Sequence, residues 1–270
     1  MTDWMRYAER VVAERYGARV SCMAAGDMTR RHGRVTTSII NTETLVAQLQ
    51  SPEVEETYAT TNSIDSVVSS SAADTGTVRA QVQGYYYDGT DLVYHTQLRP
   101  LVGQTPVTLT QPLCRVDRAY NPIGIAYQGV ISVFDSTLAG GTTAGVPNNA
   151  AATKLTIQGP SFQESSKCAF SVAANEYAFV AQLQCSIERQ APPTNTVDIR
   201  VQRRDQNGVW RTTCMLTSLT TDAVAQASME IHPWVPFVPN ADGRVICLST
   251  AINIPVNATL GLVRARILDV

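Results

Sequence analysis

Apolar and polar residues alternate with a period of two in several stretches beyond about residue 56. Such alternation is typical of a half-buried β-strand, because successive side chains of a strand point to opposite faces of the sheet. The clearest stretches form two pairs, and each pair is joined by a turn rich in Asp, Asn and Gly. These are 77–87 with 92–96, joined by Asp88-Gly89-Thr90-Asp91, and 197–204 with 209–216, joined by Asp205-Gln206-Asn207-Gly208. We predict a β-hairpin for each pair.

Further short strands are predicted between and after these hairpins. They cover 106–110, 113–120, 129–134, 154–157, 168–172, 178–187, 243–250 and 260–268. Many short strands with turns and no helical pattern between them predict an all-β fold, an antiparallel β-sandwich or jelly roll. Residues 137–153, rich in Gly, Ala, Thr and Asn, are predicted to be a surface loop without a packed element. The pattern leaves open whether the chain forms one sandwich or two lobes divided near 137–153.

Residues 1–16 show a helical period instead. Thr2 suits a helix N-cap and Gly17 suits a C-terminal stop. The apolar residues that share one face of this helix are Trp4, Tyr7, Ala8, Val11 and Val12. This stripe has two interpretations: the helix packs on its own domain, or it is an arm that docks on a neighbouring subunit.

Residues 18–55 show no clear period. We therefore interpret 1–55 as an N-terminal arm with one amphipathic helix, and 56–270 as the β-sandwich or jelly-roll region. Within the arm, Arg30, Arg31, His32 and Arg34 form a basic cluster. The cluster is either a solvated face or an electrostatic contact with an acidic partner surface. No aromatic residues are interleaved with it, so the cluster does not indicate binding of single-stranded nucleic acid.

The composition indicates an unusually neutral surface. Of the 270 residues, 44% are hydrophobic and only 16% are charged, against about 25% in typical globular chains. The formal net charge is -2, and this balance disfavours a nucleic-acid binder, which needs a basic face. Low charge with ordinary hydrophobicity excludes a disordered chain and favours a protein that loses surface to neighbours in an assembly.

The six cysteines are widely spaced and include no CxxC pair, so a structural zinc site is not expected. The N-terminus lacks the basic and apolar regions of a signal peptide, and no apolar stretch approaches the length of about 18 residues that spans a membrane. We expect a protein made in a cytoplasm, with no metal, no cofactor and no membrane or nucleic-acid partner.

The sequence does not predict an enzyme. The three histidines, His32, His95 and His232, lie in different regions, and HExxH, GxSxG, GxGxxG and P-loop motifs are missing. The two acidic turns named above fit hairpin turns better than calcium loops, which need more converging oxygens. Trp234 and Phe237, near prolines, either cradle a sugar, as in lectins, or act as packing anchors.

One block of the sequence carries a resemblance. It begins with Ser63–Gly76, which contains Ser69-Ser70-Ser71-Ala72-Ala73-Asp74-Thr75, and continues through the strand 77–84, Gly103-Gln104-Thr105-Pro106-Val107 and Arg115-Val116-Asp117-Arg118. Farther along come 170–179 and the hairpin with Val201-Gln202-Arg203-Arg204 and Asn207-Gly208-Val209-Trp210. In this order the segments resemble a family of tailed-bacteriophage virion structural proteins that includes capsid decoration (cement) proteins. The chain departs from that family where Gly76 runs directly into the strand and where Ala173-Ala174-Asn175 replaces Pro-Ala-Gly.

The resemblance implies a non-enzymatic protein that decorates and stabilises a phage capsid by bridging neighbouring major capsid proteins. It also implies that the protein forms a homo-oligomer, namely a trimer. The oligomer is then expected on the capsid surface of a virion that is assembled in the host cytoplasm. The candidate contacts with partners are Trp4, Tyr7, Val11, Arg30, Arg31 and Arg34. The alternative is a receptor- or glycan-binding module of a head or tail fibre or of the neck.

Overall fold

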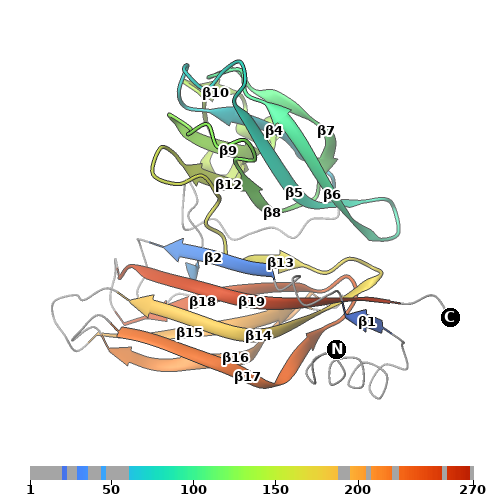
Figure 1. The fold of residues 1–270 in the computed structure, drawn as a ribbon, viewed down its shortest axis with the longest axis vertical. Helices are drawn as coiled ribbons and strands as arrows, with labels where there is room; N and C mark the ends of the chain where they lie inside the picture. The colour runs from blue at the N-terminus through green and yellow to red at the C-terminus, as the bar shows by residue number, and fades with distance from the viewer. Residues whose placement is uncertain are drawn as a thin grey trace. The chain divides into compact units, whose positions relative to one another are not determined.

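The computed structural model describes residues 20–22, 29–35, 44–46, 61–187, 195–204, 208–220, 225–250 and 254–267. It confirms the predicted fold class, because these segments form antiparallel β-sheets almost throughout (Figure 1). The chain divides into two compact units. Unit 1 consists of Met1–Val46 and Cys168–Val270, and unit 2 consists of Ala47–Lys167. Unit 2 is therefore inserted into the chain of unit 1.

This division differs from the expected one, which set 1–55 apart as an arm and placed a subdivision near 137–153. The chain leaves unit 1 after Val46 and returns to it at Cys168. These two residues are neighbours, because the Cys168 amide donates to the Val46 carbonyl at 3.0 Å. The Val245 amide in turn donates to the Cys168 carbonyl at 2.8 Å. The exit and the return of the inserted unit are thus adjacent on unit 1.

Unit 1 contains two antiparallel sheets. The first has the order β1–β19–β14–β17, with β2 also paired to β19, and the second has the order β13–β18–β15–β16, with β3 also paired to β18. The strands of the first sheet are β1 (Val20–Cys22), β2 (Thr29–Val35), β14 (Glu176–Ile187), β17 (Ala225–Phe237) and β19 (Val256–Ile267). Those of the second are β3 (Thr44–Leu45), β13 (Ala169–Ser171), β15 (Thr196–Arg204), β16 (Trp210–Thr220) and β18 (Asp242–Ser249).

With the short strands β1 and β13 set aside, the strand order of unit 1 is that of a jelly roll. In chain order, the first, eighth, third and sixth strands (β2, β19, β14, β17) share one sheet. The second, seventh, fourth and fifth (β3, β18, β15, β16) share the other. This order results when consecutive strands are exchanged between two sheets as paired Greek keys. The main apolar core of unit 1 includes the fully buried residues Phe170, Leu183, Ile199 and Leu260.

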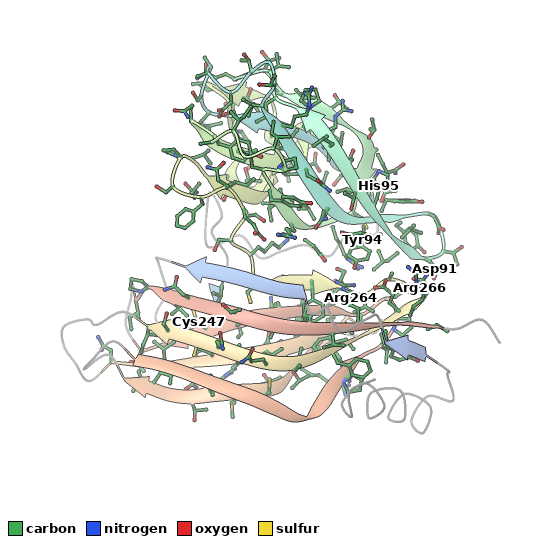
Figure 2. All side chains as sticks on the ribbon, viewed as in Figure 1. Asp91, Tyr94, His95, Cys247, Arg264 and Arg266 are labelled. Atoms are coloured by element: carbon green, nitrogen blue, oxygen red, sulfur yellow. The ribbon has the colours of Figure 1, made fainter. Side chains whose placement is uncertain are left out.

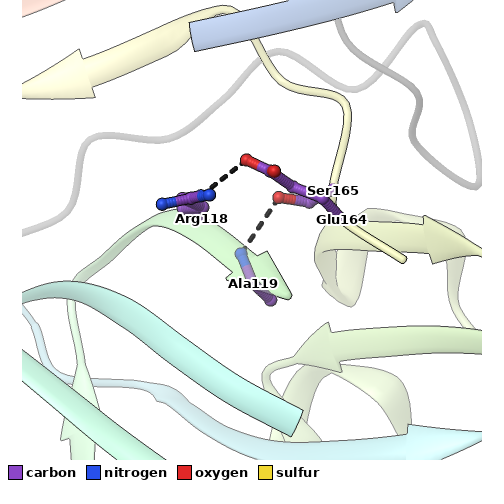
Figure 3. Close-up of polar contacts among 4 residues, drawn as sticks. All are labelled: Arg118, Ala119, Glu164 and Ser165. Atoms are coloured by element: carbon purple, nitrogen blue, oxygen red, sulfur yellow. Dashed lines mark hydrogen bonds and ion pairs between the residues drawn. The ribbon is translucent and has the colours of Figure 1, made fainter. Parts of the chain in front are cut away.

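Unit 2 also contains two main antiparallel sheets, β12–β9–β4–β7 and β6–β5–β8. Their strands are β4 (Ile64–Ser69), β5 (Arg79–Tyr87), β6 (Leu92–Pro100), β7 (Val107–Leu113), β8 (Arg115–Tyr120), β9 (Val130–Phe134) and β12 (Thr153–Gln158). Its core includes the buried residues Val67, Leu101, Tyr127 and Ile131. The segment that follows β12 runs beside β8, where the Arg118 guanidinium pairs with Glu164 at 2.5 Å and the Ala119 amide donates to the Ser165 hydroxyl at 3.0 Å (Figure 3).

The prediction that 137–153 builds no packed element is wrong. The segment contains α2 (Ser136–Ala139), β10 (Thr142–Thr143), β11 (Val146–Pro147) and η1 (Ala150–Ala152). The Asp135 side chain caps α2 and the Asn149 side chain caps η1, each by accepting from a backbone amide. Ala139 and Ala152 are buried together with residues of β4 and β9. Small side chains and local caps therefore make a compact structure out of a sequence without an apolar period.

Part of the predicted arm also belongs to the sheets. β1 and β2 pair with β19, and β3 pairs with β18, although residues 18–55 show no strand period. The pairing partners lie about 200 residues away in the sequence, so local patterns do not reveal them. The helix predicted for residues 1–16 lies outside the described residues.

Candidate functional site

The residues predicted to contact partners are Trp4, Tyr7, Val11, Arg30, Arg31 and Arg34. The first three lie outside the described residues. The three arginines lie on β2, whose backbone pairs with β19 from Val256 to Leu262. They therefore belong to a sheet of unit 1 and not to a separate arm.

A second candidate site lies in unit 2, where loops from three parts of the chain meet the end of β4. The Ser69 amide donates to the Gly103 carbonyl at 3.2 Å, and the Gly103 amide donates to the Asp74 carbonyl at 2.8 Å. The Ser70 amide donates to the Val130 carbonyl at 2.9 Å, and the Ser70 hydroxyl accepts from the Val130 amide at 2.9 Å. The segment 69–74 is thus bonded to the loop at Gly103 and to the start of β9.

The Asp74 side chain holds this meeting point together. It is 0% exposed, and its Oδ2 accepts from the Ser69 hydroxyl at 2.5 Å and from the Gly129 amide at 3.1 Å. Its Oδ1 accepts from the Gln128 amide at 2.8 Å. A buried carboxylate is stable only when such donors replace the water it has lost. Asp74 therefore fixes the loop before β9 against the segment after β4.

Glycines allow the loops to approach this closely. A Cβ added to Gly103, Gly129 or Gly145 would collide with the backbone of the segment after β4. The nearest backbone atoms would be the Ala72 oxygen at 2.9 Å, the Ser71 nitrogen at 2.5 Å and the Ser69 oxygen at 1.9 Å, respectively. At Gly145 the φ angle of 73° also favours glycine. These contacts bring the β10–β11 turn against the end of β4.

The surface formed by these loops carries apolar and neutral groups. Val102 is 52% exposed and Val146 is 38% exposed, and small exposed residues lie on the same mutually contacting loops. We call this the neutral loop surface and define it by Ala72, Ala73, Val102, Ala144 and Val146. The segments 101–114 and 136–153 contain no charged residue, and the one charge in 66–76 is the buried Asp74.

Sequence reasoning did not select this surface. Asp74 lies in a segment of small and polar residues, and no local pattern marks it as a buried acceptor. The signal present in the sequence was the long interval without charge, from 136 to 153, in a chain that was already poor in charge. Which loops lie together could not be read from it.

His95, Cys214 and Cys247 pack against neighbouring residues. His95 follows Tyr94 on β6 (Figure 2). Its ring packs edge-to-face on that of Tyr86, with the ring centroids 6.1 Å apart. Burial raises the pKa of the Cys214 thiol to about 11 and that of the Cys247 thiol to about 12, which suppresses the reactive thiolate.

The described residues contain no group of three or more His, Cys, Asp or Glu side chains placed to hold a metal ion. No described helix is both long and apolar enough to cross a membrane.

Of the two residues considered for sugar binding, Phe237 is a packing anchor. It ends strand β17, is fully buried, and its ring lies 4.9 Å from that of Phe170. The lectin-like interpretation of Phe237 is therefore wrong. His232 and Trp234 also belong to β17 and not to a loop.

Comparison with known proteins finds no matching family model and no matching curated protein. Solved structures of infectious bursal disease virus are weakly similar. For the Gx strain the identity is 9%, the alignment covers 88% of this chain and 72% of that chain, and the TM-score is 0.26. For the VP2 subviral particle the identity is 12%, with 88% and 71% covered and a TM-score of 0.25. TM-scores of this size do not establish a common fold.

Proposed function

We propose that this chain is a non-enzymatic structural protein of a virion. The observation that carries the proposal is the jelly-roll strand order of unit 1, β2–β19–β14–β17 over β3–β18–β15–β16. Jelly rolls are common in viral capsid domains, although lectins and cupins also use them, so this support is by analogy of fold. The resemblance of the block around Ser69–Thr75 to phage virion proteins points the same way.

The finer proposal is that the protein decorates a capsid and bridges neighbouring major capsid proteins, forming homo-oligomers on the particle. A charged fraction of only 16% suits a protein that loses much surface to neighbours, because few charges must then be desolvated. Arg30, Arg31 and Arg34, on β2 of the jelly roll, supply the candidate electrostatic contact with an acidic coat surface.

A second candidate is that the chain builds the shell itself. One observation favours it: both sheets of the jelly roll are formed within unit 1, and unit 2 is inserted at one connection, between β3 and β13. In a chain with this organisation, unit 1 can pack against other copies of itself to form a shell, and unit 2 is a separate domain that can make other contacts.

The full chain expressed alone, examined by velocity sedimentation and electron microscopy, tests these proposals. Closed shells would support the second candidate. Discrete oligomers that bind empty particles of the same virus and raise their melting temperature would support decoration. Binding to host cells or glycans, without binding to particles or formation of shells, would favour the receptor-binding alternative and contradict the structural role.

A variant with Arg30, Arg31 and Arg34 all replaced by Gln tests the electrostatic contact. Glutamine removes the charges and keeps side chains of comparable length. We expect reduced occupancy on particles, with a difference from the unchanged chain that shrinks as salt is raised. Equal occupancy of both chains at low salt would exclude the contact. A variant with Arg200, Arg203 and Arg211, on β15 and β16, replaced by Gln removes the same number of charges elsewhere and is the matched control.

A further inference from the structure

We propose that the neutral loop surface of unit 2 contacts the same surface of a second copy of this chain, around a rotation axis. The inference deepens the proposed function and rests on it, since a virion brings many copies together. The contact itself is a property of the chain and is measurable without particles.

The absence of exposed charge favours a second copy over a different protein. Residues beside a rotation axis meet their own counterparts from the neighbouring copy. A charged side chain at such a place faces an identical charge, and this repulsion opposes association. Interfaces with a different partner commonly use complementary charges instead. The segments that form the neutral loop surface present no charged side chain, because Asp74 is buried beneath them.

The exposed groups of this surface also suit a close contact. Val102 and Val146 are large enough to bury apolar area when covered, and Ala72, Ala73 and Ala144 allow backbones to approach. Thr105 and Gln104, which are exposed beside them, supply neutral hydrogen-bonding groups for the rim. The two valines would form an apolar centre, and the neutral polar groups would form a rim around it. This is the usual arrangement of a protein interface.

The loops are ordered before any contact forms. Asp74 accepts hydrogen bonds from two backbone amides and one hydroxyl, and Gly145 packs directly on Ser69. Gln104 donates from Nε2 to the Ser70 carbonyl at 2.8 Å. Ordering a loop at the moment of binding weakens association, and this surface has little left to order.

The surface is small. A stable interface buries about 800 Å² on each partner, more than a few exposed side chains supply. We therefore expect weak, concentration-dependent self-association in solution, which multiple contacts in an assembly strengthen through high effective concentration.

Sedimentation equilibrium of the full chain over a wide concentration range tests the inference with a charge-swap design. Val102→Lys and Val102→Glu each place like charges at the axis, and we expect each to weaken self-association by about tenfold or more. Mixing the two variants in equal amounts sets Lys against Glu and is expected to restore association to near the original level. Val209→Lys, at a valine that is 55% exposed in unit 1, is the matched control and is expected to associate normally.

The rescue by mixing is the decisive result, because only a residue that meets its own counterpart can show it. A chain that stays monomeric up to about millimolar concentration would overturn the inference. So would unchanged association of the two Val102 variants, or a mixture no better than either variant alone. The proposed function fails differently, through a chain that forms no shells and binds no particles. Circular dichroism of each variant shows whether the fold is intact.

Discussion

Replacing Asp74 with Ala removes the acceptor that joins two loops of unit 2. The change leaves the buried Ser69 hydroxyl and the buried Gly129 amide without their partner, and also the amide of Gln128, whose bond is only partly buried. Each buried donor left unsatisfied costs about 1–3 kcal/mol. The Ala variant no longer has the free-energy cost of burying a carboxylate, and this offsets part of the loss. We expect a loss of about 3–5 kcal/mol in the free energy of unfolding of unit 2.

Asp88→Ala is the matched control. The Asp88 side chain also accepts from two backbone amides, those of Thr90 and Asp91, both at 2.9 Å. Asp88 is exposed, however, so water replaces the lost acceptor and the expected loss is much smaller than for Asp74→Ala. The contrast between the two variants isolates the effect of burial.

The distribution of aromatic residues allows each unit to be followed separately. Trp4, Trp210 and Trp234 all belong to unit 1, whereas the fully buried Tyr85 and Tyr127 belong to unit 2. In a urea titration, tryptophan fluorescence therefore reports unit 1 and the tyrosine near-UV circular dichroism reports mainly unit 2. A loss of 3–5 kcal/mol moves the midpoint of the tyrosine transition by about 2 M urea.

Hydrogen exchange gives a second test beside the urea titration. Hydrogen exchange should show that the amides of Gln128 and Gly129 are protected in the unchanged chain and lose protection in the Asp74→Ala variant. If Asp74→Ala moves the tyrosine transition no farther than Asp88→Ala does, the carboxylate does not hold the loops together and the reasoning is refuted.

Two more predictions concern close packing and pH. Gly145→Ala and Gly76→Ala each place an alanine in a left-handed backbone conformation, with φ angles of 73° and 69°. This conformation costs an alanine about 1–2 kcal/mol. Only Gly145 would also bring a Cβ against Ser69, so its variant should lose at least about 2 kcal/mol more in the tyrosine transition; equal losses would contradict the packing. Burial raises the pKa of Cys247 from 9.0 to about 12, so its contribution to stability is present below pH 9 and is lost as pH rises toward 12. We expect unit 1 to lose about 1 kcal/mol per pH unit above pH 9 from this thiol, and Cys247→Ala, followed by tryptophan fluorescence, to flatten that slope; an unchanged slope would speak against it.

The hairpins show what local sequence can predict. Strands β5 and β6 pair from Arg79 with Pro100 to Tyr87 with Leu92, as the alternation and the turn residues predict. The turn itself follows from chemistry within a few residues: two backbone amides donate to Asp88 and lower the pKa of its carboxyl group. Both the periodic strands and the polar turn are properties of neighbouring residues, and sequence reasoning captures such properties well.

The arrangement of the candidate sites depends on contacts between distant residues instead. Asp74 bonds to amides that follow it by 54 and 55 residues, and nothing around Asp74 indicates those partners. Likewise, β2 becomes a strand by pairing with β19, although its sequence, Thr29 to Val35, is polar and rich in Arg. A local pattern does not record such long-range partners, and for that reason it does not reveal where the chain divides into its two units.

The neighbouring positions of Val46 and Cys168 make unit 2 a closed loop of about 120 residues as seen from unit 1. An unfolded loop of that length opposes the joining of its ends by about 4 kcal/mol through chain entropy. The hydrogen bonds that join Val46, Cys168 and Val245, where β3 and β13 meet β18, offset part of that cost. The segment 47–167 is therefore replaceable as a unit. A different domain with adjacent ends, or a short linker, could take its place while the jelly roll keeps its own strand order.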